Sequence, residues 1–377
     1  MTTVQRWTGK ETRALRLSLR LTVRGFAADL GVGVRTVANW EAGGSGVVPR
    51  PELQAALDTL LGRADLDAQD RFARSLGGQS PVESEDAGAE LRGRLAAASA
   101  VDTETIRLLT AQLNDIRAMD RMLGAETSAP QLSGYLDTVK GLRSFTIGNR
   151  ETLADLYADA ATLAGWQCLD TGCVGAAWRH YEAAKEAGRE GRSRSALVHA
   201  LAEQTYVLLE INDIGRAAEL AEYACSLAAG RVPALLSSWL WAVRGEVHAA
   251  AGNISDCHAA FEAAARALPT DPLDPDLPFV VLSEVHLARW RGNAWATLGD
   301  QAAIIELEAA LDRLDESFVR ARAGLHADLA GAFLARKRPE PASAHLQAGE
   351  ALATRVGSVR QQRRMSRIRS ALVGAAG

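Results

Sequence analysis

One arrangement of residues recurs from about residue 151 onward, and it limits the fold more than any other feature. Each copy has a long apolar segment with helical spacing, a short turn and a second, alanine-rich helical segment. The turns are predicted near Gly172, Gly215, Gly252, Gly299 and Arg338. A single helix pair of this kind cannot bury its own apolar face, so successive pairs are expected to stack. The pattern predicts an all-α protein whose larger part is a solenoid of helix pairs.

The segments after these turns also share a short motif. After Gly172 the sequence is Ala176-Ala-Trp-Arg-His-Tyr-Glu-Ala-Ala, and after Gly252 it includes Ala-Ala-Phe261-Glu. A glycine turn followed by an alanine-rich segment with Tyr/Phe-Glu, spaced Ala-Ala-x-x-x-Tyr-Glu after Gly172, resembles the second half of the tetratricopeptide repeat. This resemblance implies a tetratricopeptide-like α-solenoid whose concave surface receives a peptide, a small molecule or a protein.

Residues 26–41 predict two short helices that meet at a tight turn. Gly31 supplies the turn, where a side chain would be crowded. Five residues form the inward faces of the two helices: Phe26, Ala27, Leu30, Val37 and Trp40. Flanking amphipathic helices, at about 11–20 and 52–61, complete a small domain. The segment therefore predicts a helix-turn-helix, with an ordinary helical hairpin as the alternative.

The helix-turn-helix segment and its flanks resemble a known family. Residues 7–63 open with Trp-Thr-Gly and close with Trp-Glu-Ala-Gly followed by Pro-Arg-Pro-Glu-Leu. They resemble the Xre-type, phage-repressor-like DNA-binding domain, in which the second helix enters the major groove. The resemblance implies that Val34, Arg35 and Asn39 contact DNA bases. It also implies that Thr36 and Arg50 contact the DNA backbone.

Other positions of this family correspond here to a structural ion pair or to departures from the family sequence. Arg16 and Glu41 match a buried ion pair that ties the first helix to the end of the recognition helix. Gly33 and Val23 depart from the family, which has a Ser or Thr cap and a phosphate-binding Gln at these positions. Arg24, or the backbone amides of its helix, is expected to replace the missing phosphate contact.

The division of charge along the chain agrees with binding to double-stranded DNA. The whole chain has a formal charge of -4, but residues 1–63 contain nine Arg or Lys and five Asp or Glu. A basic domain on an acidic body is what neutralisation of phosphates requires. Because the excess is small, two copies are expected to act together, so the sequence predicts a homodimer on a pseudo-palindromic site.

The segment that follows this domain, residues 64–101, is predicted to be a linker. Residues 75–89 are rich in turn formers and acids and offer almost nothing to bury. Beyond it, five apolar residues recur at helical spacing behind the cap residue Asp102: Ile106, Leu109, Leu113, Ile116 and Leu123. This helix either forms a dimer or is the first helix of a repeat domain over 102–377, and the second alternative is favoured.

As a whole, the chain resembles the actinobacterial Xre-type regulators that join a helix-turn-helix to a tetratricopeptide-like body. This resemblance implies a sequence-specific transcription regulator whose body senses an effector or binds a partner. Repression by occupying a promoter is the default expectation. The alternative is a protein-interaction scaffold that uses the repeats and has no sequence-specific DNA binding.

Large aromatic residues gather in the repeats, where most are expected to be core. Trp241, Arg244 and His248 follow one another at three- and four-residue steps, so they share a helix face that mixes aromatic and polar groups. They are the candidate effector pocket, with a place in the repeat core as the favoured alternative.

No pattern in the sequence indicates an enzyme, a cofactor or a metal. Cys168, Cys173 and His180 lack a fourth zinc ligand, and neither a phosphate-binding loop nor a Gly-x-Ser-x-Gly motif occurs. No apolar run approaches the roughly 18 residues of a membrane span, and the first twenty residues lack the apolar block of a signal peptide. Four scattered cysteines agree with a cytoplasmic protein.

The C-terminal segment is rich in arginine and has no acid after Glu350. Six arginines belong to it: Arg355, Arg360, Arg363, Arg364, Arg367 and Arg369. The segment is expected to be a final helix with solvated charges, with binding to an acidic partner or to DNA as the alternative.

Overall fold

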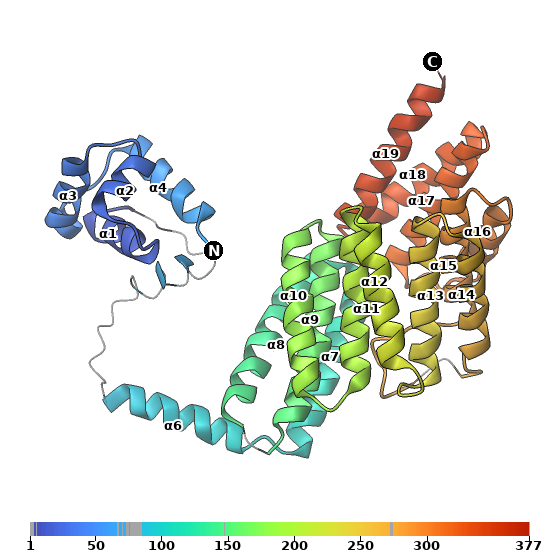
Figure 1. Ribbon diagram of the computed structural model, residues 1–377, viewed down its shortest axis with the longest axis horizontal. Coiled ribbons are helices and arrows are strands. Elements are labelled where there is room, and N and C mark those ends of the chain that lie inside the picture. The colour runs from blue at the N-terminus through green and yellow to red at the C-terminus, as the bar shows by residue number, and fades with distance from the viewer. Residues whose placement is uncertain are drawn as a thin grey trace. The chain divides into compact units, whose positions relative to one another are not determined.

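The chain divides into two compact units, residues 1–91 and 92–377, and each is described by itself. The computed structural model describes residues 4, 6–65, 68–69, 71–72, 75, 85–146, 148–271 and 274–376. Within these residues every regular element is a helix (Figure 1). The predicted all-α class is therefore confirmed.

Between residues 6 and 65, the part of the first unit that is described without a gap, the structure has four α-helices and one short 3-10 helix. They are α1 (Gly9–Ser18), α2 (Val23–Asp29), α3 (Val34–Gly43), the 3-10 helix Gly44–Gly46 and α4 (Pro51–Arg63). Pro51 takes the first position of α4, where its missing N–H costs nothing. Gly31, with φ of 65°, makes the turn between α2 and α3. The helices begin and end within a few residues of the predicted ranges.

The core of this unit forms where α1, α2 and α3 meet. Phe26 and Val37 are fully buried, as predicted from their spacing. Thr8 and Glu11 form a capping box that fixes the start of α1. A Cβ atom on Gly9 would lie 1.7 Å from the carbonyl oxygen of Trp40, so α1 and α3 cross in backbone contact. Glycine at this position is therefore a requirement of helix packing.

The core of the first unit extends beyond the predicted domain end at residue 63. Phe72 is fully buried and stacks on Trp7, with ring centroids 5.5 Å apart. Arg71 donates a hydrogen bond of 2.8 Å from Nη2 to the carbonyl oxygen of Ser18. A single aromatic residue has no periodicity, so the sequence pattern did not reveal it. Within the predicted linker the structure also has the helix α6 (Glu85–Ser99), whereas residues 76–84 lie outside the described residues.

The second unit is built from six antiparallel helix pairs and a final helix. The pairs are α7 (Thr103–Leu123) with α8 (Ala125–Phe145), α9 (Arg150–Asp170) with α10 (Val174–Glu190), α11 (Arg194–Glu210) with α12 (Ile214–Ala228), α13 (Ala234–Ala250) with α14 (Ile254–Ala267), α15 (Glu284–Leu298) with α16 (Ala302–Arg313), and α17 (Val319–Ala335) with α18 (Pro339–Arg355). The final helix is α19 (Val359–Ala376). Helices of successive pairs lie side by side, which is the arrangement of tetratricopeptide-like repeats (Figure 1).

A residue with left-handed backbone conformation marks the turn inside each pair. Gly172, Gly252 and Gly299 occupy this position with φ of 78°, 75° and 75°, as predicted. The prediction for Gly215 is wrong, because that residue lies in the first turn of α12. Asn212, with φ of 62°, makes the turn instead. Asparagine is one of the few residues other than glycine that adopt this conformation readily.

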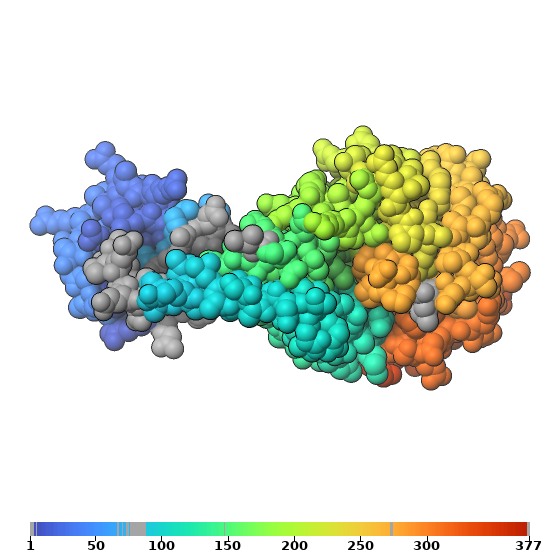
Figure 2. Space-filling model, turned by 90° about the horizontal axis from the view of Figure 1, so that it is seen from below, coloured from blue at the N-terminus to red at the C-terminus, as the bar shows by residue number. Residues whose placement is uncertain are grey.

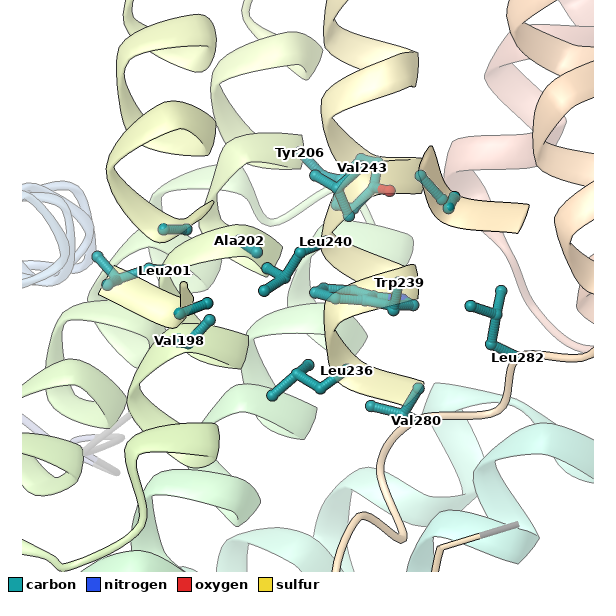
Figure 3. Packing of buried hydrophobic residues seen from close by; sticks show 14 of the residues in the cluster. Val198, Leu201, Ala202, Tyr206, Leu236, Trp239, Leu240, Val243, Val280 and Leu282 are labelled. Carbon is teal, nitrogen blue, oxygen red and sulfur yellow. The ribbon is translucent and has the colours of Figure 1, made fainter. Parts of the chain in front are cut away.

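The hydrophobic core of the body forms between the helices of neighbouring pairs. In Figure 3, Ala202 and Tyr206 of α11 lie beside Leu240 and Val243 of α13. The chain before α15 adds Leu282 to the same cluster. The core therefore continues from pair to pair, as expected for helices that cannot bury their apolar faces alone.

The helix predicted over residues 102–124 is α7, and it belongs to the body. Asp102 caps it by accepting a 2.8 Å hydrogen bond from the backbone N–H of Thr105. Leu109, Leu113 and Ile116 are buried in a cluster with α8 and α9. These three residues agree with the favoured alternative, a first helix of the repeat domain, whereas Leu123 of the predicted stripe is 48% exposed.

The array of pairs closes on itself, since α17 contacts α7 and α19 contacts α9. Figure 2 shows teal helices from the start of the body next to orange and red ones from its end. Arg320 of α17 places Nη1 2.9 Å from Asp120 of α7 and Nε 2.8 Å from Asp170 of α9. A Cβ atom on Gly124 would lie 2.0 Å from the carbonyl oxygen of Val356. These contacts are called the closing contacts below.

Candidate functional sites

The residues predicted to contact DNA lie at the surface of the first unit. Val34, Arg35 and Asn39 are exposed on α3, and Thr36 beside them is half-buried. Gly33 caps α3 without a side-chain hydrogen bond, and the first turn of the helix contains no acid. The N-terminal end of α3 therefore presents polar and cationic groups to solvent, with free backbone N–H groups behind them.

The predicted backbone-contacting arginines are exposed as well. Arg24 lies in the first turn of α2, and Arg50 is the N-cap residue of α4. Neither these two nor Arg35 takes part in an ion pair among the residues that the structure describes. Three exposed cations without internal partners remain available to phosphate groups or base edges.

Arg16 and Glu41 form an ion pair with two parallel hydrogen bonds. Arg16 donates from Nε to Glu41 Oε1 over 2.6 Å and from Nη2 to Oε2 over 2.8 Å. Its Nη1 donates to the carbonyl oxygen of Leu21. Both side chains are nearly buried, with 12% and 11% of their surface exposed. The pair joins α1 to the second half of α3 and so fixes the exposed face of α3 relative to the domain core.

Trp241, Arg244 and His248 form one cluster, but on a face of α13 that borders α12. The Arg244 guanidinium lies 5.0 Å from the Trp241 ring centroid and donates to His248 Nε2 over 3.3 Å. Its Nε is 2.6 Å from Glu222 of α12. None of the three lines the large cavity of the body. The sequence spacing thus placed the residues together correctly, while the cavity lies elsewhere.

The closed array surrounds a cavity of about 530 Å³. The first helix of each of the six pairs contributes to its wall, and α19 adds a further side. This volume lies in the range of sites that hold small organic ligands. Because the ends of the array meet, the concave surface of the repeats forms the wall of this cavity.

One side of the cavity is aromatic. Trp239 of α13 packs edge to face on Trp290 of α15, with centroids 6.0 Å apart. His199 stacks on Phe279 at 4.4 Å and lies 5.1 Å from Trp239. Burial lowers the pKa of His199 to about 3, so its imidazole is neutral and behaves as part of this wall. Trp166 and Tyr206 extend the aromatic surface.

The other side of the cavity is charged. Eight arginines contribute to the lining: Arg117, Arg121, Arg289, Arg320, Arg360, Arg363, Arg364 and Arg367. Six carboxylates accompany them: Asp120, Asp159, Glu203, Glu210, Glu246 and Asp328. Four arginines and four carboxylates form pairs, namely Arg117 with Asp159, Arg320 with Asp120, Arg360 with Glu210 and Arg364 with Asp328. Four arginines and two glutamates of the lining do not belong to these four ion pairs.

Glu203 and Glu246, the two remaining glutamates, accept hydrogen bonds from tyrosines. Tyr206 donates to Glu246 over 2.6 Å, and Tyr181 donates to Glu203 over 3.4 Å. Burial raises the pKa of Glu203 to about 7 and also raises that of Glu246. Both carboxyl groups therefore carry less negative charge near neutral pH than exposed glutamates do.

The four remaining arginines make no ion pair among the described residues of the body: Arg121, Arg289, Arg363 and Arg367. Burial lowers the pKa of Arg289 and of Arg121. The Arg289 Nε atom is buried and has no hydrogen-bond partner among the described residues. The cavity wall consequently has an excess of positive charge beside its aromatic side.

The sequence pattern did not predict the role of α19. Four of the six arginines of the C-terminal segment are exposed, as predicted: Arg355, Arg363, Arg367 and Arg369. The other two, Arg360 and Arg364, instead pair with carboxylates of α11 and α17. Arg363 lies against the turn at Gly172. The missed signal was the spacing of Arg360, Arg363, Arg364 and Arg367, which places them on one helix face.

The residues considered for zinc do not form a metal site. Cys168 is half-buried, and Cys173 is exposed at the start of α10. In the described part of the chain, no three His, Cys, Asp or Glu side chains are grouped in a way that could hold a metal ion. Among the helices of the described residues, none combines the length and the apolar character needed to cross a membrane.

The antiparallel pairs, the left-handed turns and the stacking of neighbouring pairs define the second unit as a tetratricopeptide-like helical repeat. The chain matches no protein-family model, and no curated protein matches it. Among solved structures, it is similar to the crystal structure of a Podosopora anserina putative kinesin light chain with nearly identical TPR-like repeats. That similarity has 15% identity and a TM-score of 0.35, and it covers 54% of this chain and 95% of the other.

Proposed function

We propose that the protein is a sequence-specific DNA-binding transcription regulator that acts as a homodimer in the cytoplasm, by binding and not by catalysis. The exposed face of α3 carries the proposal. Arg35 and Asn39 are the side chains best suited to read guanine and adenine in the major groove. Arg24, Thr36 and Arg50 are proposed to hold phosphates on either side of that groove. Val34 would contact a thymine methyl group.

The ion pair between Arg16 and Glu41 supports this proposal from inside the unit. A recognition helix must keep its orientation while its outer face is left free. The two parallel hydrogen bonds join α1 to α3 on the side away from Arg35 and Asn39. In this proposal the repeat body senses an effector, and repression results when the protein occupies a promoter.

Selection of bound fragments from a genomic DNA library tests the proposal. The wild type and a double variant, Arg35→Ala with Asn39→Ala, are compared at one salt concentration. Arg63→Ala, which removes one exposed cation outside α3, is the control. The wild type and the control should enrich a two-fold motif that the double variant does not enrich. Recovery of the same unselected DNA by all three proteins would refute base recognition by α3.

A protein-interaction scaffold is the second candidate function. The tetratricopeptide-like class of the body favours it, as do apolar side chains exposed on the second helices of three successive pairs. Trp178, Tyr223 and Ile254 have 38%, 53% and 57% of their surface exposed. A scaffold would enrich no DNA motif in the selection above, and the double variant would capture the same protein partners as the wild type.

A further inference from the structure

The inference concerns what the cavity of the body holds, and it begins with the unpaired cations. Arg289 lies on α15, in the cavity wall, between the aromatic and the charged sides. Its guanidinium carbon is 5.6 Å from the centroid of the neighbouring Trp290 ring. A buried cation without a partner destabilises a fold, so its presence needs an explanation other than stability.

The carboxylates around Arg289 do not supply that explanation. Asp328 is already held by Arg364 and by a 2.6 Å hydrogen bond from Asn293 Nδ2. Glu246 accepts the hydrogen bond from Tyr206. Both carboxylates favour the charged form of Arg289, yet burial outweighs them and lowers the pKa of the guanidinium. A negatively charged group bound in the cavity would stabilise the charged form of Arg289.

The aromatic side restricts the kind of anion further. Trp290 and Phe279 line the cavity and are only partly buried, so they offer ring surfaces to an occupant. Trp239 and His199, which contact these two rings, are buried. Flat apolar groups pack well on such surfaces, whereas an inorganic ion would leave them facing water. The cavity is large enough for a ring system that carries a charged group, at about 530 Å³.

We propose that the cavity binds a compact organic anion with an aromatic ring, its anionic group against Arg289 and its ring against Trp290 and Phe279. The remaining unpaired arginines, Arg121, Arg363 and Arg367, give the cavity a positive potential that favours entry of the anion. The site deepens the sensing role in the proposed function. It would still exist if the first unit did not bind DNA.

Binding of three small probes to the full-length protein tests the chemistry of the site. The probes are 2-naphthoate, the neutral 2-naphthalenemethanol and the non-aromatic cyclohexanecarboxylate, measured by titration calorimetry. Naphthoate should bind about tenfold or more tightly than either of the other two, which corresponds to about 1.4 kcal/mol. Equal binding of the alcohol would refute the role of charge, and equal binding of cyclohexanecarboxylate would refute the role of the ring. If neither naphthoate nor 2-naphthyl phosphate binds at about 1 mM, the proposal is wrong.

Two arginines of α15 offer a matched pair of variants. Arg289→Gln removes the unpaired cation of the cavity wall. Arg291→Gln removes a cation that lies 5.3 Å from the Trp295 ring, pairs with Glu306 and does not line the cavity. Arg289→Gln should weaken naphthoate binding at least about tenfold and leave the melting temperature unchanged or higher. Arg291→Gln should lower the melting temperature and keep the wild-type affinity.

The reverse pattern would overturn the assignment. If Arg289→Gln lowers stability and keeps binding, Arg289 is a structural residue. A third variant, Arg244→Gln, examines the cluster predicted from the sequence, and loss of binding in that variant would place the site beside α12. DNA selection with Arg289→Gln separates this proposal from the previous one, because the substitution should leave the selected motif unchanged.

Discussion

Glu203 is the residue whose ionisation is most altered by the fold near neutral pH. It lies in the wall of the cavity and faces His199, Tyr181, Glu246 and Arg360. Burial raises its pKa to about 7, above the value of an unfolded chain. The folded protein therefore holds a proton that the unfolded chain has already lost at neutral pH. The stability that comes from this proton is fully present below about pH 4.5 and is lost as the pH rises through about 7.

Glu203→Gln should remove this pH dependence, because the amide stays neutral. The variant should match the wild type below about pH 4.5 and exceed it above pH 7 by at most about 3 kcal/mol of unfolding free energy. Urea unfolding at several pH values measures the difference. His199 has the opposite effect, because its lowered pKa costs stability as the pH falls, so the excess stability of Glu203→Gln is measured at pH 7 and above, where His199 is neutral.

Glu210→Gln is the control for that experiment, since Glu210 is paired with Arg360 at 3.0 Å in the same cavity wall. It should lower stability at neutral pH, in contrast to Glu203→Gln. If both variants lower stability equally at pH 8, burial of Glu203 has not made its charged form unfavourable.

Among the elements, the hairpin of α7 and α8 depends most on its turn. Gly124 has φ of 87° and touches the backbone of Val356, which lies in the turn before α19. Alanine there would need both a left-handed conformation and space that the Val356 carbonyl group occupies. Gly124→Ala should therefore cost more than about 1 kcal/mol of unfolding free energy, measured by urea unfolding.

Gly134 provides a matched substitution in the same hairpin. It lies inside α8, and a Cβ atom there would meet nothing within 4 Å. Gly134→Ala should raise the unfolding free energy by roughly 0.5–1 kcal/mol, because alanine favours the helix. Similar results for the two alanine variants would mean that the contact between Gly124 and Val356 does not hold the array closed.

Most individual elements could be predicted from the sequence, since helical spacing, caps and glycine turns act over short stretches of chain. The turn at Asn212 was missed because Gly215 stands three residues away and glycine is the stronger turn signal. The closing contacts could not be predicted, because no local pattern relates Gly124 to Val356. The arginines of α19 were expected to face solvent because their spacing shows that they share a helix face but not what that face contacts.

Across the whole molecule, Arg320 joins segments that are far apart in the chain, since it pairs with Asp120 and Asp170. The side chains of Asp120 and Asp170 are 3% and 1% exposed. Arg320→Leu would leave both carboxylates buried without their cation, and we expect a loss of about 3–5 kcal/mol. The measurement is urea unfolding followed by tryptophan fluorescence, because Trp166, Trp239 and Trp290 line the cavity.

A triple variant without the three charges provides the contrast. Arg320→Leu combined with Asp120→Asn and Asp170→Asn removes the uncompensated charges and should recover part of the lost stability. No recovery would indicate that the arginine contributes through packing and not through its charge.

The two units are expected to fold independently. In the described part of the chain, each hydrophobic cluster draws its residues from one unit only. A chain beginning at Arg92 should therefore keep the melting transition that the body shows in the full-length protein. A drop of more than a few degrees in calorimetry would indicate that the first unit supports the body.

The candidate sites illustrate what sequence patterns can and cannot provide. Exposure of Arg35 and Asn39 followed from helix periodicity and from the family resemblance. The cavity could not be predicted in this way. Its wall takes a few residues from each of seven helices, and only the fold brings these residues together. The local pattern of a pocket is present at Trp241, Arg244 and His248, but these residues do not line the cavity.

Closure also determines how such a protein can change during evolution. An open solenoid can gain or lose a repeat at little cost, since each repeat touches only its neighbours. Here the duplication of one helix pair would separate Arg320 from Asp120 and Asp170 and would open the space that they enclose. We therefore expect proteins related to this one to diverge by substitution inside the repeats while the number of helix pairs stays constant.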